Sequence, residues 1–232
     1  MKSICFSILF SLIICDGYSQ QSNCAGSSEV DYGNWVQRGL IGFEYKNPVL
    51  GYRGGQYFND WTTGEVMMKN GDLIKDISLR YDKYLDGLLW LRKTDFKTGV
   101  ISKEAISDFR LFDVRNQNKI LASFTNKKIM LQKTDSTFVF LQVLVSGELS
   151  LYVYRNMNVI TTTDYVLNDN TRYFVGFAGK QYPISLRRRS LLKIPVIQKT
   201  EMKSVLRSNG IIMINSEQDL IYVISAYNAR KK

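Results

Sequence analysis

The sequence contains no histidine, and this absence removes a large part of enzyme chemistry. Nucleophilic sites that use imidazole as a general base, such as Ser-His-Asp and Cys-His sites, are excluded. Most zinc and transition-metal sites are excluded as well, because they rely on imidazole or on several thiolates. We therefore expect a non-catalytic protein without metal or cofactor. The enzymatic alternatives that remain depend on carboxylates or lysines.

The sequence also lacks any apolar run of the roughly 20 residues that a helix needs to span a membrane. The apolar run at Ile4–Cys15 is shorter, and it follows the positive charge of Lys2. Small residues, Gly17 and Ser19, stand at positions −3 and −1 before Gln20. This order is typical of a secretory signal peptide over residues 1–19. We expect an exported protein that is periplasmic, associated with the outer membrane or extracellular.

Cysteine is scarce, and Cys5 and Cys15 both lie within the predicted signal peptide. Cys24 alone remains after cleavage, so the mature chain cannot form an internal disulfide and must be stabilised by its core. A lipoprotein processing site at Cys15 is the alternative to simple cleavage. It is disfavoured because Ile14 is bulky where a small residue is expected.

Acidic residues are scarce in the C-terminal quarter of the chain. Residues 171–232 contain twelve Lys and Arg but three Asp and Glu, a net charge of +9 out of +10 for the whole sequence. For an exported protein, such a segment favours anionic lipid, acidic polysaccharide or an acidic protein as the partner, with peripheral membrane contact, over nucleic acid. The alternative is a solvated basic face that keeps the protein soluble. The oligomeric state is not indicated.

The pattern of residues predicts three regions after the signal peptide. Residues 20–60 are rich in glycine and aromatic residues and form an irregular lead-in, with one short strand near residues 40–45. Residues 61–186 form a β-rich domain, because apolar residues alternate or run continuously over several short segments. The predicted strands are 64–69, 72–81, 84–92, 105–112, 119–125, 138–145, 149–155, 173–177 and 182–186, with a loop at 168–170.

Turn residues support the β-rich prediction. Asn70-Gly71 predicts a hairpin with a two-residue type I′ turn, in which both residues have positive φ. Asp86-Gly87 predicts a bulge or kink within the strand that contains it.

The last region, residues 187–232, has helical periodicity. Helices are predicted over residues 187–194, which Pro195 ends, and 197–208, which Asn209-Gly210 caps. A third helix follows Ser216, which begins a capping box. Strands followed by helices indicate the α+β class, with an antiparallel sheet, partial barrel or sandwich and a small C-terminal helical cap packed on it.

A family resemblance rests on motifs between residues 60 and 228. Trp61-Thr62-Thr63-Gly64-Glu65-Val66, the turn glycine of Asn70-Gly71, and the segment Leu79–Asp86 resemble a pattern in secreted, functionally uncharacterised proteins of Bacteroidetes bacteria. The segment Ser216–Leu220 and the closing Tyr227-Asn228 resemble the same proteins. These motifs form turns, core positions and helix caps. The resemblance therefore implies an exported protein with the same fold, but it implies no activity.

The helix predicted at 197–208 carries its cations at a spacing of four residues, which places them on one stripe. Met202, Val205 and Leu206 form the adjacent apolar stripe. A run of arginines and a lysine comes shortly before this helix. We therefore predict an anion- or partner-binding surface made by Arg187, Arg188, Arg189, Lys193, Lys199, Lys203 and Arg207.

Two other functions remain open. A carboxylate-dependent glycan hydrolase would need two carboxylates across a cleft, and candidates on or near the strands are Glu65, Asp82, Asp86 and Glu148. A carrier of an apolar ligand would need a closed β-barrel with an empty interior. The lead-in contains five aromatic residues that either stack on sugar rings or pack onto the sheet: Trp35, Tyr45, Tyr52, Tyr57 and Phe58.

Overall fold

The computed structural model describes residues 40, 42–46, 55–93, 95–116, 119–131, 136–159 and 167–230, all within one compact unit, residues 31–232. The predicted signal peptide, Cys24 and most of the lead-in lie outside these residues. Among the described residues, no helix is long and apolar enough to cross a membrane.

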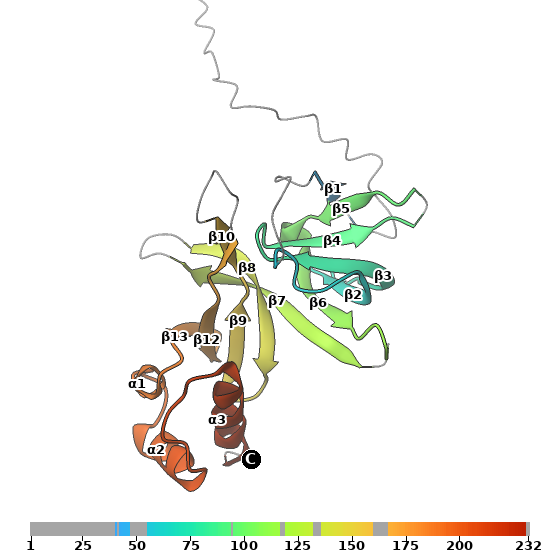
Figure 1. Cartoon of the computed structure of the whole chain (residues 1–232). Helices are drawn as coiled ribbons and strands as arrows, with labels where there is room; N and C mark the ends of the chain where they lie inside the picture. The colour runs from blue at the N-terminus through green and yellow to red at the C-terminus, as the bar shows by residue number, and fades with distance from the viewer. Residues whose placement is uncertain are drawn as a thin grey trace, which may run out of the picture. The chain divides into compact units, whose positions relative to one another are not determined.

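The described chain forms thirteen strands followed by three α-helices (Figure 1). The strands are β1 Gly42–Glu44, β2 Thr62–Met68, β3 Leu73–Asp82, β4 Gly87–Leu91, β5 Thr98–Ile101, β6 Ile106–Phe112, β7 Ile120–Met130, β8 Ser136–Val145, β9 Ser150–Tyr154, β10 Met157–Val159, β11 Leu167–Asp169, β12 Arg172–Phe177 and β13 Lys180–Ile184. A short 3₁₀ turn, Lys103–Ala105, precedes β6. The helices are α1 Arg188–Leu191, α2 Lys199–Ser208 and α3 Glu217–Arg230.

Eleven of these strands form one antiparallel sheet in the order β1-β5-β4-β3-β2-β6-β7-β8-β9-β12-β13. The strands β10 and β11 pair separately. The large sheet is open, with β1 and β13 at its two edges, and Pro183 lies in the edge strand β13. The predicted α+β class, with an antiparallel sheet followed by helices, is confirmed.

The hairpin between β2 and β3 forms at the predicted place, but its turn is not type I′. Gly71 has φ +96°, whereas Asn70 is not among the residues with positive φ. The Gly71 amide donates to the Met68 carbonyl oxygen (3.0 Å), and the Met68 amide donates to that of Asp72 (2.8 Å). The loop is therefore one residue longer than predicted, and a single left-handed residue closes it.

The strand predicted from residue 84 begins only at Gly87. One carboxylate oxygen of Asp82, Oδ1, accepts the amide hydrogens of Tyr84 (2.9 Å) and Leu85 (3.0 Å), which holds these two residues in a loop. Asp86 has φ +48° at the end of that loop. The predicted kink at Asp86-Gly87 is thus the point where the chain enters β4.

The predicted loop at residues 168–170 is also partly wrong. Its first two residues belong to β11, which pairs with β10 through Met157↔Asp169 and Val159↔Leu167. Asparagine and aspartate disfavour strands only weakly, and here the pairing with β10 overrides that preference.

The first half of the sheet curves around an aromatic core. Tyr81, Phe109, Phe124 and Phe140 come from β3, β6, β7 and β8, and each is at most 1% exposed. The rings of Phe109 and Phe124 stack with centroids 4.6 Å apart, and Tyr81 lies 4.8 Å from Phe124. This packing fills the concave side, so the described residues give the carrier alternative no support.

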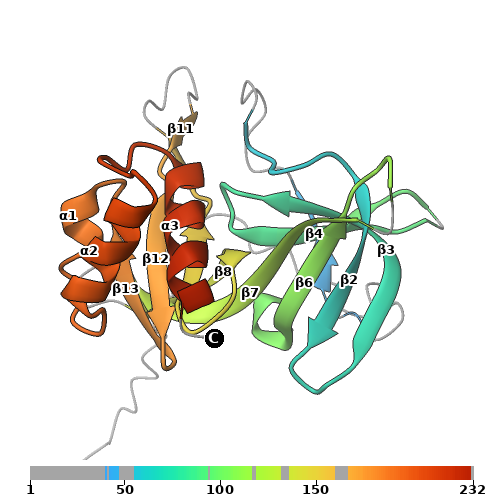
Figure 2. The same ribbon diagram turned by 90° about the horizontal axis from the view of Figure 1, so that it is seen from below.

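The helices cover one face of the second half of the sheet, beside β12 and β13 (Figure 2). Leu151 and Val175 of the sheet share a core with Leu191, Met202 and other residues of the helices. Asn228 of α3 attaches this layer to the sheet, because its side chain donates to the Leu149 carbonyl oxygen (2.8 Å) and accepts from the Leu149 amide (2.9 Å).

The helix ends agree closely with the local sequence. Ser216 Oγ accepts the Asp219 amide hydrogen (3.1 Å), and Asp219 Oδ2 accepts that of Ser216 (3.0 Å), so the predicted capping box is confirmed. Gly210 has φ +65° after α2, as its predicted cap requires. The first helix is the exception: it is predicted over residues 187–194, whereas α1 spans only Arg188–Leu191.

Candidate anion-binding surface

The helix α2 separates its apolar and charged residues on two faces. Met202, Val205 and Leu206 are fully buried in the core that the helices share with the sheet. Lys199, Lys203 and Arg207, the predicted stripe, are all exposed. Because these cations recur every four residues, they lie along one side of the helix and face solvent together.

The acidic residues of the helical region have other partners. Glu201 accepts a hydrogen bond from the Tyr227 hydroxyl (3.2 Å), and Glu217 forms an ion pair with Arg155 (2.8 Å). Asp219 accepts the amide hydrogens of Asn215 and Ser216, and these hydrogen bonds lower the pKa of its carboxyl. Within the described part of the chain, no ion pair involves the seven predicted cations.

A shallow hollow of about 560 Å³ lies on the exposed side of α2. Its lining combines positive charge with hydroxyl groups: Thr200, Lys203, Ser204, Arg207 and Ser208. Arg230 of α3 donates to Ser204 Oγ (3.0 Å) and also to Ser208 Oγ. Ammonium, guanidinium and hydroxyl donors of this kind suit phosphate, sulfate and carboxylate oxygens.

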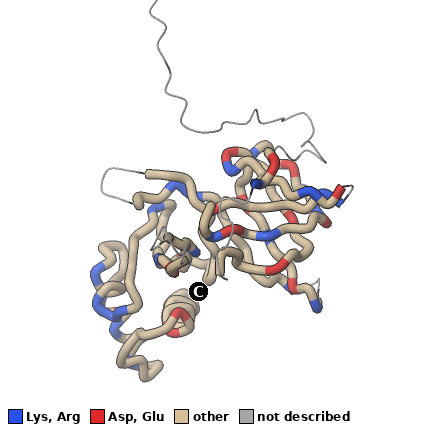
Figure 3. The backbone as a smooth tube through the Cα atoms, turned by 45° about the horizontal axis from the view of Figure 1, so that its top comes forward, with Lys and Arg blue, Asp and Glu red and all other residues tan. Residues whose placement is uncertain are grey.

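The arginines before α2 lie in the same helical layer but do not line this hollow. Arg187, Arg189 and Lys193 are exposed and Arg188 is partly buried, on and around the short helix α1. Figure 3 shows Lys and Arg positions along the helical part of the chain, whereas most Asp and Glu positions lie in the β-rich part. The structure therefore brings Lys203 and Arg207 together in a hollow and adds the four α1 cations to the layer around it.

Arg230 is the residue of this surface that sequence reasoning missed as a site residue. It lies at the end of α3, and its approach to Ser204 and Ser208 depends on how α3 packs against α2. That packing is tertiary, and no local spacing in the sequence indicates it.

The carboxylates proposed for a glycan hydrolase do not gather in one site. Glu65 lies with Asp108 in a hollow of about 420 Å³ on the sheet. Their strands are neighbours, since the register pairs Glu65 with Arg110 and Met67 with Asp108. Arg110 forms an ion pair with Glu65 at 2.9 Å. A concave site with two carboxylates thus exists, but one of the two is already paired with an arginine.

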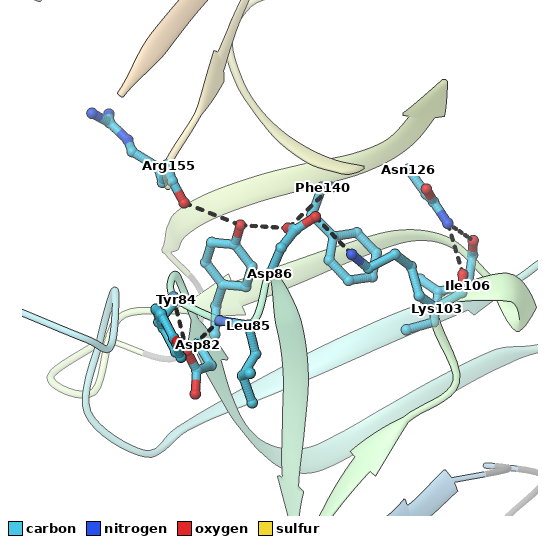
Figure 4. A network of polar contacts seen from close by, with 10 residues as sticks. Asp82, Tyr84, Leu85, Asp86, Lys103, Ile106, Asn126, Phe140 and Arg155 are labelled. Carbon is cyan, nitrogen blue, oxygen red and sulfur yellow. Dashed lines mark hydrogen bonds and ion pairs between the residues drawn. The ribbon is translucent and has the colours of Figure 1, made fainter. Parts of the chain in front are cut away.

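Asp82 and Asp86, two other candidates, are buried in a polar network (Figure 4). Asp86 accepts hydrogen bonds from the Tyr81 hydroxyl (2.7 Å), the Lys103 ammonium (2.7 Å) and the Phe140 amide (3.3 Å). Burial raises the pKa of Asp86, and the charge of Lys103 opposes that rise. Each oxygen of Asp86 is occupied by protein donors, so the network has a structural role.

The described aromatic residues of the lead-in contact the rest of the fold. The Tyr45 hydroxyl donates to Asp82 Oδ2 (3.0 Å) and lies 3.1 Å from that of Tyr57. Phe58 meets Phe124 edge to face at 5.3 Å. Trp35 and Tyr52 lie outside the described residues. For Tyr45 and Phe58, packing against the sheet is therefore the observed arrangement.

Comparisons with known proteins found no matching family model, no matching curated protein and no matching solved structure. The resemblance to secreted Bacteroidetes proteins stays a prediction from the motifs.

Proposed function

We propose that this chain is an exported, non-catalytic protein of the cell envelope that binds an anionic surface through its basic helices. The sequence of residues 1–19 supports export. The binding surface consists of the three exposed cations of α2, of Arg230, and of the four cations on and around α1: Arg187, Arg188, Arg189 and Lys193. A histidine-free chain whose buried carboxylates are engaged by protein donors supports a binding role over catalysis.

One observation carries the proposal, and it is the absence of acidic partners for this surface among the described residues. Surface cations that serve only solubility are commonly interspersed with acids. Here the three acids of the helical region are used by Tyr227, Arg155 and the start of α3. The cations of α2 thus form no ion pair among the described residues, and with Glu201 on the same helix α2 keeps a net charge of +2 (Lys199, Lys203 and Arg207 minus Glu201), which attracts anions from solution.

The strength of this attraction follows from the number of cations. Near an anionic membrane each Lys or Arg contributes about 1 kcal/mol, so the three cations of α2 contribute about 3 kcal/mol, roughly a hundredfold in partitioning. Salt screens this contribution, because the Debye length falls to about 8 Å at physiological ionic strength.

The test is co-sedimentation of the purified protein with vesicles of phosphatidylglycerol and phosphatidylcholine, and with vesicles of phosphatidylcholine alone, over a salt series. The variant K199Q/K203Q/R207Q is expected to bind the anionic vesicles about a hundredfold more weakly than the wild type. The matched control K93Q/K97Q/K119Q removes the same charge from exposed positions outside the helices and is expected to bind nearly as the wild type does.

Two results would overturn the proposal. One is a wild-type protein that does not bind anionic vesicles even at low salt. The other is equal weakening by the α2 variant and by the control, which would show that total charge matters and that this surface does not.

A further inference from the structure

The connection between α2 and α3 exposes two large apolar side chains. It contains four consecutive apolar residues, Ile211-Ile212-Met213-Ile214. The outer two turn inward, since Ile214 is 1% exposed and Ile211 packs against the helical core. The inner two turn outward, with Ile212 80% exposed and Met213 65% exposed. Among the exposed large apolar side chains of the described chain, Ile212 has the highest exposed fraction, and exposed apolar side chains that lie together mark surfaces that contact a membrane or another protein.

The outward orientation of these two side chains is set by fixed points on both sides of the loop. The Ile211 amide donates to the Leu206 carbonyl oxygen (2.9 Å), which attaches the loop to the last turn of α2. On the other side, Asp219 accepts the amide hydrogen of Asn215 (2.9 Å). Figure 2 shows this connection crossing from α2 to the start of α3. Ile212 and Met213 are thus presented at the tip of a loop anchored at both ends.

The surroundings of the tip suit the interface between lipid and water. Arg207 lies in the last turn of α2, and the Gly210 amide at the start of the loop donates to its carbonyl oxygen (3.1 Å). Tyr222 of α3 is 51% exposed. Its hydroxyl donates to Oδ1 of Asn209, the residue directly before Gly210, at 2.9 Å. An arginine and a tyrosine at the base of the loop that carries the apolar tip suit a protein that binds at the membrane surface.

Two acids at the start of α3 lie near the tip in sequence, and groups of the protein interact with both of them. Glu217 is paired with Arg155 at 2.8 Å. Asp219 is bonded to backbone amides where the helix dipole favours negative charge. The repulsion that these acids exert on an anionic bilayer is therefore reduced.

We infer that the anionic surface is a lipid bilayer, and that Ile212 and Met213 insert into it while the α2 cations bind the headgroups. This inference rests on the proposed function and specifies its partner. An acidic polysaccharide is strongly hydrated and offers no apolar environment to these side chains. A bilayer supplies both the negative charge and the apolar layer beneath it, so it accounts for the two features together.

The test compares I212S/M213S with the wild type in the vesicle assay. The partition coefficient of the variant is expected to fall at least about tenfold at low and at physiological salt alike, since burial of apolar area is not screened by salt. At low salt the intact α2 cations still hold the variant on anionic vesicles, whereas at physiological salt this attraction weakens. The matched control is M130S, because Met130 is 66% exposed on β7, outside the helical layer, and it is expected to bind as the wild type does.

A second measurement locates the tip directly. In I212W, tryptophan emission is expected to be quenched by lipids brominated in their acyl chains, beyond the quenching of the wild-type tryptophans. Both substituted positions are exposed, so these variants are expected to fold normally, which thermal unfolding checks.

The outcomes separate the two proposals. If I212S/M213S binds like the wild type at every salt concentration, or I212W is not quenched, insertion is refuted. The proposed function still stands if K199Q/K203Q/R207Q then binds weakly and its control does not. If the wild type does not bind anionic vesicles at all, the proposed function itself fails, and the inference fails with it.

Discussion

Replacing Lys103 by methionine is expected to destabilise the fold by leaving a buried carboxylate without its counter-charge. The Lys103 ammonium lies 2.7 Å from Asp86 Oδ2, and the side chains are 24% and 7% exposed. The same ammonium lies 5.3 Å from the centre of the Phe140 ring. Methionine keeps the apolar stem of the lysine in place, so the substitution chiefly removes the charge.

The size of the effect follows from the geometry of the pair. A pair of unit charges 2.7 Å apart attracts by about 6 kcal/mol at an effective dielectric constant of 20, before desolvation is subtracted. Removing one partner of a buried pair typically costs about 3–5 kcal/mol. Because Lys103 is a quarter exposed, water screens the pair, and we expect about 3 kcal/mol at pH 7.

The loss depends on pH, and its sign follows from the burial of Asp86. Burial raises the pKa of this carboxyl, and Lys103 opposes the rise, so removing Lys103 raises the pKa further. A raised pKa means that the folded state binds the proton more tightly than the unfolded state does. The stability lost in Lys103→Met is therefore largest at neutral pH. It decreases as the pH falls through the raised pKa toward the ordinary aspartate value of about 3.9.

Urea unfolding at pH 7 and at pH 4.5 measures both effects. The matched control is Lys127→Met, because Lys127 also lies over a ring, 5.6 Å from that of Tyr152, but has no ion pair within the described chain. The control is expected to lose less than about 1 kcal/mol. A loss for Lys103→Met that equals the control, or that does not shrink at pH 4.5, would refute the electrostatic argument.

The remaining predictions concern the attachment and the cap of α3. Asn228→Ala leaves the amide and carbonyl groups of Leu149 buried without partners and is expected to cost about 2–4 kcal/mol in urea unfolding. Gly147→Ala is expected to destabilise as well, because its Cβ would lie 2.4 Å from Asn228 Nδ2, and the double variant should lose less than the sum of the two. Additive losses would contradict this contact. Ser216→Ala removes the N-cap of α3 and is expected to lower the melting temperature by an amount equivalent to about 1 kcal/mol, whereas Ser216→Asp should not.

Features that depend on neighbouring residues could be predicted from the sequence. The stripe of Lys199, Lys203 and Arg207 follows from helical periodicity, and the capping box of Ser216 and Asp219 spans three residues. Asn70-Gly71 indicated where the chain reverses. The type of turn was wrong because the hydrogen bond of Met68 with Asp72 lengthens the loop, and pairing of the flanking strands sets that register.

Features that depend on packing could not be predicted. Tyr84 favours a strand and Leu85 is apolar, but their amides donate to the carboxylate of Asp82, and these hydrogen bonds replace those of strand pairing. Arg230 joins the basic surface only because α3 packs beside α2. The pairing of Glu65 with Arg110 joins residues 45 positions apart in sequence. Sequence periodicity indicates which face of an element is polar, but not which distant element lies against it.

The proline in β13 has a consequence for self-association. An open sheet ends in a strand whose outer backbone groups can bind a strand from another molecule, and repetition of that event leads to fibrils. Pro183 has no N–H group, so a row of donors along β13 is interrupted. At the opposite edge, β1 offers only three residues. Both ends of the described sheet are therefore poor templates for the addition of further strands.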